Sequence, residues 1–150
     1  MRAVVCKEWG GPETLVVEEV ADPVAGPGEV CIDVHAASVN FADTLLIAGT
    51  YQVKPERPFS PGMEVGGVVS GVGDGVTQVK LGQRVMALTG EGAYAEKVVV
   101  EEKGVFAIPD SMGFDEGASF PVAYGTSHLG LRHRGNLKAG EVLVVHGAAG

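Results

Sequence analysis

The stretch that decides the fold is Phe59-Ser60-Pro61-Gly62-Met63-Glu64-Val65-Gly66-Gly67-Val68-Val69-Ser70-Gly71-Val72-Gly73-Asp74-Gly75. Its second half is rich in valine and glycine, and the Asp-Gly pair at its end is typical of a tight turn between strands. Glycines weaken a strand, and they are found where another backbone approaches closely or where a sheet bends. The stretch therefore predicts a tightly curved strand that ends at Asp74-Gly75.

Glu64 lies at the start of this strand, among residues with little side chain. It is open to two interpretations. It is either a structural acid, buried and held by backbone N–H groups or by an arginine such as Arg84, or a functional acid in a site. Most buried acids are paired for structural reasons, so the local pattern favours the structural interpretation.

The composition is that of a folded, turn-rich β protein. The 150 residues can bury one ordinary core, and they are 45% hydrophobic with 23 glycines and 8 prolines. Short runs of strand-forming residues separated by turns predict a bent, barrel-like sheet and a β-rich α+β fold class. Besides the central stretch, strands are expected at residues 2–7, 15–20, 30–35, 92–100 and 105–108, and a turn followed by a strand is expected at 79–87.

Charge and cysteine content exclude several classes of function. The formal net charge is −8, so a nucleic acid backbone or an anionic membrane surface would be repelled. No apolar run approaches the ~20 residues of a spanning helix, and Met1-Arg2 leads into a short strand rather than a signal peptide, which predicts a cytoplasmic protein. Cys6 and Cys31 are the only cysteines, too few for a disulfide framework or a four-cysteine zinc site.

Two side chains outside the central stretch are candidates for a site. Tyr51 lies in a proline-containing loop at residues 50–61, where it either faces a cleft or covers the edge of the core. His35 falls on the polar face of its strand without a partner at metal-ligand spacing, so we interpret it as an ordinary surface or packed residue.

The chain changes character after Pro109. Before this point the sequence predicts one short helix, at residues 43–48. After it, a helical turn is expected at 115–118 and a helix at 122–134 that ends at Gly135. The run Val142-Leu143-Val144-Val145-His146 is apolar without alternation, as in a strand buried on both faces of a parallel sheet.

This run leads into Gly147-Ala148-Ala149-Gly150, as a dinucleotide-binding fold begins with a strand followed by a glycine turn. A parallel strand needs neighbouring strands to satisfy its backbone hydrogen bonds, so an isolated one at the end of the chain would leave these groups unpaired. We therefore interpret the 150 residues as a portion of a longer protein.

A series of motifs in the order of the chain resembles the medium-chain dehydrogenase/reductase superfamily, and within it the zinc-independent NADPH:quinone oxidoreductases. The motifs are Pro27-Gly28-Glu29-Val30, Ser38-Val39-Asn40-Phe41-Ala42-Asp43, Pro61-Gly62-Met63-Glu64-Val65-Gly66-Gly67, Gly82-Gln83-Arg84-Val85, Gly92-Ala93-Tyr94-Ala95-Glu96, Phe120-Pro121-Val122-Ala123-Tyr124-Gly125-Thr126 and Val142-Leu143-Val144-Val145-His146-Gly147-Ala148-Ala149-Gly150. Together they cover essentially the whole chain.

The resemblance implies a GroES-like catalytic domain, a distorted β-barrel, over residues 1–120. Residues 121–150 would be the connecting helix and the first strand of a truncated Rossmann domain. The rest of that domain lies outside these residues, so we expect this portion alone to be inactive and to lose most of its affinity for the cofactor.

Departures from the zinc-dependent relatives imply that no metal is bound. Those relatives carry a cysteine where Asn40 stands and a histidine where Met63 stands, and neither an amide nor a thioether is a credible ligand for zinc. Their four-cysteine lobe is replaced here by residues 86–92. Glu64 matches the acid beside the former zinc position, and without the metal we interpret it as chiefly structural.

The chemistry that the resemblance implies is metal-free hydride transfer. Alcohol oxidation needs a Lewis acid, whereas a quinone or another α,β-unsaturated carbonyl acceptor can take hydride from NADPH once it is oriented and receives hydrogen bonds. The implied catalytic residues are Asn40 and Tyr51, and the implied cofactor-binding residues are Asn40, Thr126, Gly147 and Gly150.

The implied partners are a small-molecule quinone or enone and, for the full-length protein, a second copy in a homodimer. The alternative function is a non-catalytic GroES-like binding or assembly module. Such a module has no evident use for residues 142–150, so the sequence favours the enzyme.

Overall fold

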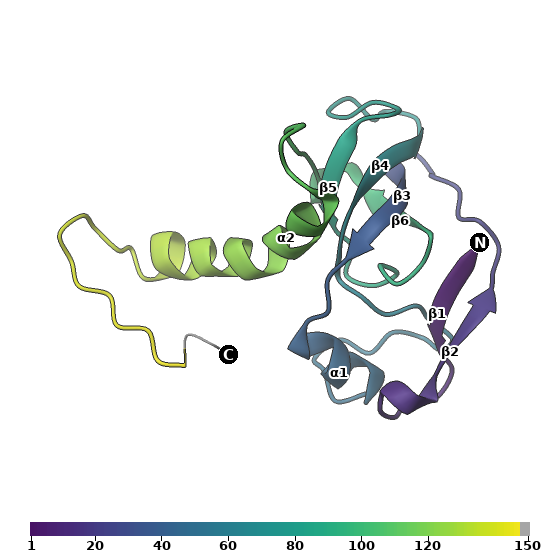
Figure 1. Cartoon of the computed structure of the whole chain (residues 1–150), viewed down its shortest axis with the longest axis horizontal. Helices are drawn as coiled ribbons and strands as arrows, with labels where there is room; N and C mark the ends of the chain where they lie inside the picture. The colour runs from purple at the N-terminus through teal and green to yellow at the C-terminus, as the bar shows by residue number, and fades with distance from the viewer. Residues whose placement is uncertain (148–150) are drawn as a thin grey trace.

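A computed structural model of the protein describes residues 1–147, and two antiparallel sheets form its body (Figure 1). The smaller sheet pairs β1 with β2, and the larger has the strand order β6-β3-β4-β5-β7. The strands are β1 (Arg2–Cys6), β2 (Leu15–Glu19), β3 (Glu29–Ala37), β4 (Glu64–Val72), β5 (Arg84–Leu88), β6 (Lys97–Glu101) and β7 (Val105–Ala107).

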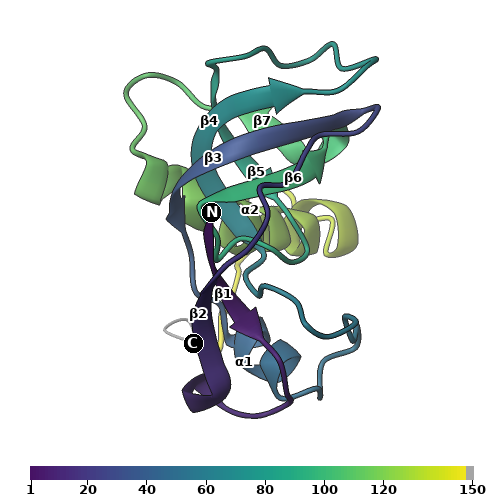
Figure 2. The ribbon, with the colours of Figure 1, turned by 90° about the vertical axis from the view of Figure 1, so that its right-hand side faces the viewer.

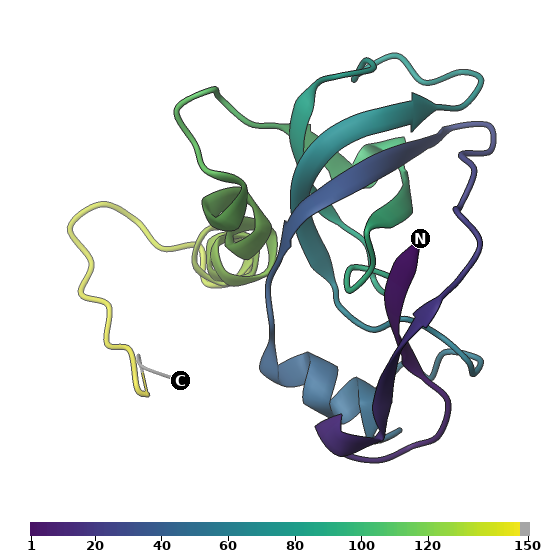
Figure 3. The ribbon, with the colours of Figure 1, turned by 45° about the vertical axis from the view of Figure 1, so that its right-hand side comes forward.

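The larger sheet curls into half a barrel, and the β1–β2 pair and α1 (Phe41–Ile47) lie at its lower end (Figure 2). Register shifts in the β3–β4 pairing, between Cys31 and Ile32 and between Val34 and Ala36, are of the kind that bends a sheet. The second helix, α2 (Phe114–His128), packs on β3, β4 and β5 and lies beside the sheet in Figure 3. These findings confirm the β-rich fold class with few helices.

The predicted curvature of the central strand is confirmed. A Cβ atom at Gly66 would lie 2.1 Å from the carbonyl oxygen of Phe114, and one at Gly67 would lie 2.2 Å from that of Asp33. Only glycine allows α2 and β3 to approach β4 this closely. The strand ends before the predicted turn, where Gly75 adopts a φ of 82°.

Two buried clusters stabilise the fold. The first fills the half-barrel with side chains from all five strands of the larger sheet, among them Ile32, Val65, Val85, Val98 and Val105. The second lies between β1, α1 and the loop after α1, and it consists of Cys6, Leu46, Ile47 and Phe59. Tyr51 and Met63 pack against this second cluster.

One predicted strand is shorter than expected, and one predicted turn and strand is found. The strand expected at 92–100 begins at Lys97, because the backbone N–H groups of Ala93 and Tyr94 donate instead to the carbonyl oxygens of Gly62 and Pro61, at 3.2 and 3.0 Å. The turn and strand expected at 79–87 are confirmed as a turn at residues 81–82 and β5 from Arg84.

The helical turn and the helix predicted on either side of Pro121 are one helix. Helix α2 starts at Phe114, runs through Pro121 and continues as the π-helical segment η3 (Leu129–Arg134), which ends at Gly135 as predicted. Proline removes one helical hydrogen bond, but Pro121 is buried together with Gly117 and Ala118. Packing on the sheet therefore keeps the helix continuous, and the boundary predicted at residues 120 and 121 falls inside it.

The strand predicted at residues 142–146 is not formed. Residues 141–145 have no regular structure, and Val142 and Val144 are 89% and 68% exposed. A parallel strand exists only when neighbouring strands satisfy its backbone groups, and no strand in the described part of the chain pairs with this segment.

Candidate active site

Glu64 is the centre of a buried hydrogen-bond cluster at the start of β4. Its side chain is 1% exposed, and its Oε1 accepts hydrogen bonds from the hydroxyl of Ser38 and from Nδ2 of Asn40, the latter at 3.0 Å. Its Oε2 accepts from the backbone N–H of Val122 at 2.7 Å. The cluster therefore joins β4, the loop after β3 and helix α2 through one carboxylate.

The predicted partnership of Glu64 with a backbone N–H is confirmed, and the one with Arg84 is wrong. The Arg84 guanidinium lies over the ring of Phe114, 4.0 Å from its centroid, and donates to the carbonyl oxygen of Met112. No Lys or Arg within residues 1–147 forms an ion pair with Glu64. Neutral donors alone therefore hold this carboxylate, and they satisfy both of its oxygens.

Asn40 precedes α1 and is held at both its backbone and its side chain. Its backbone N–H donates to Oδ2 of Asp43 at 2.7 Å, in the first turn of the helix. Its Nδ2 lies 3.1 Å from the hydroxyl of Ser38 and 3.0 Å from Glu64. The side-chain amide is thus fixed against the buried carboxylate.

Asp43 and Tyr94 form a second layer of the same cluster. Asp43 is 4% exposed, and its Oδ2 accepts from the Tyr94 hydroxyl at 2.9 Å, while its Oδ1 has no hydrogen-bond partner in the described part of the chain. The same hydroxyl lies 3.2 Å from the carbonyl oxygen of Ser38. Burial, followed by the hydrogen bond to Asp43 and the charges of Asp43 and Glu64, raises the pKa of Tyr94 well above its usual value. Tyr94 therefore stays a neutral donor at physiological pH.

Tyr51 lines a separate cavity of about 470 Å³. The cavity is also lined by Leu46, Val53, Pro55, Met63, Thr89, Gly90 and Glu91. The hydroxyl of Thr89 donates to the carbonyl oxygen of Gly62 at 3.1 Å, so its proton is already used. Met63 lines this cavity and directly precedes Glu64 in the chain, so the cavity and the buried cluster are joined by consecutive residues.

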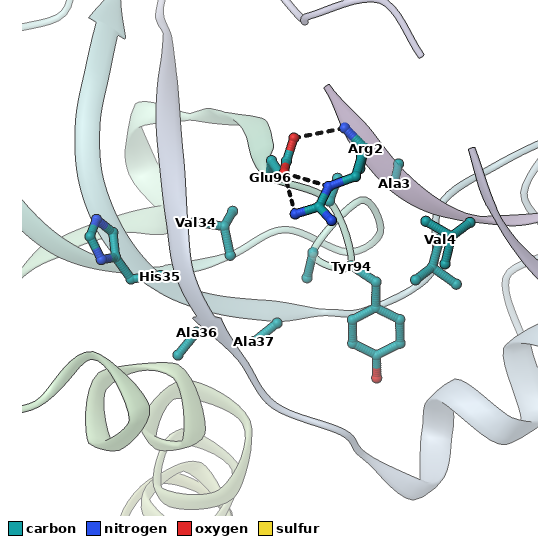
Figure 4. Close-up of a pocket in the computed structure, with 12 residues that line it drawn as sticks. Arg2, Ala3, Val4, Val34, His35, Ala36, Ala37, Tyr94 and Glu96 are labelled. Atoms are coloured by element: carbon teal, nitrogen blue, oxygen red, sulfur yellow. Dashed lines mark hydrogen bonds and ion pairs between the residues drawn. The ribbon is translucent and has the colours of Figure 1, made fainter. Parts of the chain in front are cut away.

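A smaller hollow of about 320 Å³ is lined by Tyr94 and its neighbours (Figure 4). Arg2 and Glu96 line it and pair with each other, with their closest side-chain atoms 2.8 Å apart. His35, at its far end, stacks on Phe114 with 4.4 Å between the ring centroids, which agrees with its interpretation as a packed surface residue. This hollow therefore offers no unpaired charge to a ligand.

The structure places the predicted site residues at different points. Asn40 joins the Glu64 cluster, whereas Tyr51 lines the separate cavity. Thr126 is exposed on the half of α2 that projects away from the sheet (Figure 1). Gly147 is exposed with a φ of 65°, and Gly150 lies outside the described residues. No hydrogen bond in the described part of the chain links Tyr51, Thr126 or Gly147 to Asn40.

Sequence reasoning missed Ser38, Asp43 and Tyr94 as members of the cluster. The spacing of Asn40 and Asp43 is the signature of a helix start, in which an acid three residues later accepts from the first backbone N–H. That signal identifies Asp43. No local pattern identifies Tyr94, because its partners lie more than fifty residues away.

Within residues 1–147, no group of three or more His, Cys, Asp and Glu side chains is arranged to hold a metal ion. The helices of this part of the chain are too short or too polar to cross a membrane.

Comparison with known proteins gives consistent matches. A family model, the alcohol dehydrogenase GroES-like domain, matches residues 26–110. Quinone oxidoreductase-like protein 2 of Rattus norvegicus is 42% identical over 149 residues, which are 99% of this chain and 42% of the rat protein.

Solved structures agree with these matches. The quinone oxidoreductase of Pseudomonas syringae pv. tomato has a TM-score of 0.92 at 35% identity, covering 99% of this chain and 46% of that one. The quinone oxidoreductase of Thermus thermophilus, solved also in complex with NADPH, has a TM-score of 0.80 at 37% identity, covering 94% and 43%. The chain thus spans less than half the length of these relatives.

Proposed function

The chain belongs to the alcohol dehydrogenase GroES-like domain family, and on this premise we propose that it is the catalytic portion of an NADPH-dependent, metal-free oxidoreductase. The full-length protein would transfer hydride to a quinone or another α,β-unsaturated carbonyl acceptor. The resemblance to quinone oxidoreductases of the medium-chain dehydrogenase/reductase superfamily is confirmed by relatives that match almost the whole chain. Their names support the proposed acceptor.

The observation that carries the proposal is the chemistry of the cavity beside Tyr51. Its walls are largely apolar, and Glu91 is the one charged residue that lines it. Because the Thr89 proton is used by Gly62, the Tyr51 hydroxyl is the remaining side-chain donor among the lining residues. An apolar cavity with one donor suits an uncharged acceptor whose carbonyl oxygen gains negative charge when hydride arrives.

The absence of a catalytic metal is proposed from the donor set. Nδ2 of Asn40 already bonds to Ser38 and Glu64, and Met63 offers a thioether to the cavity. Zinc prefers thiolate, imidazole and carboxylate ligands, so this pair gives it no suitable site. The substrate must then be reactive without a Lewis acid, which supports quinones and enones over alcohols.

The described residues fit the nicotinamide end of the proposed cofactor. Asn40 carries a half-buried amide on the Glu64 cluster, and Thr126 has an exposed hydroxyl on α2. When bound, NADPH supplies the hydride, while Asn40 and Tyr51 orient the reacting groups and Thr126, Gly147 and Gly150 contact the cofactor. We propose that the isolated chain is inactive, and that the full-length protein is a cytoplasmic homodimer.

The test is a comparison of two reactions of the full-length protein. We expect NADPH oxidation with 1,4-benzoquinone or a simple enone, and no reduction of NADP⁺ with primary or secondary alcohols. Binding of NADPH without turnover on any quinone, enone or enoyl thioester would contradict the proposal and favour the non-catalytic binding module.

A further inference from the structure

We propose that Glu64 is a positioning residue that fixes the orientation of the Asn40 side-chain amide, so that Asn40 presents its Oδ1 as a hydrogen-bond acceptor to the carboxamide N–H₂ of a bound nicotinamide ring. The inference rests on the proposed function. It assigns different partners to the two predicted catalytic residues, with Asn40 on the cofactor and Tyr51 on the acceptor substrate.

The orientation follows from what each group can donate. A carboxylate only accepts hydrogen bonds, so the end of the Asn40 amide that faces Glu64 must be its N–H₂ group. Nδ2 of Asn40 lies 3.0 Å from Oε1 of Glu64. The Ser38 hydroxyl donates to the same Oε1 and is itself 3.1 Å from Nδ2 of Asn40, so both acceptors lie on one side of the amide.

The carboxylate itself cannot turn away from Asn40. Its other oxygen is held by the backbone N–H of Val122 at 2.7 Å, and its side chain is 1% exposed. The backbone of Asn40 is fixed by Asp43 at 2.7 Å. With both ends anchored, a 180° rotation of the amide would place Oδ1 against a carboxylate oxygen and lose the hydrogen bond.

The unpaired atom of Asn40 is therefore Oδ1, because no group within residues 1–147 donates to it. Quinones and enones carry only acceptor oxygens at the reacting end, so a carbonyl oxygen does not bind them. The carboxamide of nicotinamide carries an N–H₂ group, and the hydroquinone product carries O–H groups. Both of these ligands therefore carry a hydrogen-bond donor for Oδ1 of Asn40, whereas the oxidised substrate carries none.

The Tyr51 hydroxyl has the opposite character. It lines the apolar cavity and is the side-chain donor left there for a carbonyl oxygen. Asn40 and Tyr51, both predicted as catalytic residues, are thus given different roles. Asn40 aligns the ring that gives up hydride, and Tyr51 binds the oxygen that gains charge.

The experiment uses the full-length protein and isothermal titration calorimetry. NADPH is compared with its reduced 3-acetylpyridine analogue, which keeps the carbonyl group but lacks the N–H₂ donor. One hydrogen bond corresponds to about fivefold in Kd. We expect wild type to bind NADPH about fivefold more tightly than the analogue, and Asn40→Ala to bind the two about equally.

Glu64→Gln tests the positioning role, because a glutamine at this place can face Asn40 with either its N–H₂ or its carbonyl oxygen. We expect the preference for NADPH to fall to about twofold. If this variant does not fold, Ser38→Ala, which removes one acceptor of the Asn40 N–H₂, should lower the preference in the same direction. Gln52→Ala, an exposed change in the Tyr51 loop, is the control and should leave the preference unchanged.

The outcomes separate the ligands. If Asn40→Ala leaves the preference for NADPH over its analogue intact but weakens binding of the hydroquinone more than binding of its dimethyl ether, Oδ1 of Asn40 is a hydrogen-bond acceptor for the hydroquinone product and not for nicotinamide. If Asn40→Ala changes neither ratio, the inference is wrong while the proposed function remains. Failure of the wild-type protein to bind NADPH at all would overturn both.

Discussion

The backbone N–H of Val122 donates a hydrogen bond of 2.7 Å to Oε2 of Glu64. This bond ties the start of β4 to α2 one residue after Pro121, and the other oxygen of the same carboxylate holds Ser38 and Asn40. A single buried acid therefore connects helix α2, which projects away from the sheet, with the residue proposed to contact the cofactor.

Glu64→Ala is expected to destabilise the protein by about 3 kcal/mol, because it leaves several buried donors unsatisfied and opens a cavity. The measurement is urea unfolding of the variant and wild type. Glu91→Ala, at an exposed position of the cavity rim, is the matched control and should change the free energy of unfolding little. Equal stability of both variants would show that the cluster contributes nothing to folding.

Tyr51→Phe is expected to lower turnover of the full-length protein by about 10-fold, or about 1.4 kcal/mol of transition-state stabilisation. The loss is small for a site donor, because a quinone is already reactive. Asn40→Ala should have an effect of the same size. Steady-state rates with 1,4-benzoquinone are compared with those of Tyr124→Phe, an exposed tyrosine on α2. A change in melting temperature without a change in rate would remove Tyr51 from the site.

Thr126→Val keeps the shape of the side chain and removes its hydroxyl. If this exposed hydroxyl contacts the cofactor, the variant should raise the KM for NADPH several-fold with little change in turnover at saturation. Thr50→Val, at an exposed position after α1, is the control. Unchanged affinity for NADPH in both variants would place the cofactor away from Thr126.

Tyr94 should make stability depend on alkaline pH. Its pKa is raised in the folded protein from an ordinary value of 10.0, mainly by burial and then by Asp43. The folded state therefore keeps a proton that the unfolded chain releases above about pH 10, so the stabilisation is fully present below that pH and is lost progressively as pH rises from there through the raised pKa of the folded state. Melting temperatures from pH 8 to 11 should fall more steeply for wild type than for Tyr94→Phe. Parallel curves would contradict this linkage.

Elemental analysis of the full-length protein should find no stoichiometric zinc, because an amide and a thioether stand where the zinc-dependent relatives have cysteine and histidine. About one tightly held zinc ion per chain would overturn the metal-free mechanism.

Local features of the sequence were sufficient for much of the fold. The valine and glycine pattern and the Asp74-Gly75 pair predicted β4 and its turn, because strand alternation and turn chemistry act between near neighbours. Gly66 and Gly67 predicted close approach of other backbones, although the sequence did not say which ones. Residues 142–146 show the limit of such patterns, since a parallel strand needs partners that the apolar run itself cannot provide.

The tertiary structure alone decided the candidate site. Asn40 and Tyr51 were predicted from resemblance, but the partners that hold Asn40 come from distant positions: Glu64 is 24 residues away, and Tyr94 reaches Asp43 across 51 residues. Val122 meets Glu64 across 58 residues. No periodicity links positions so far apart, because hydrogen bonds of this range form only after the sheet has curled and α2 has packed on it. The sequence thus determined which side chains were available, and packing determined which atom of Asn40 remains free for a ligand.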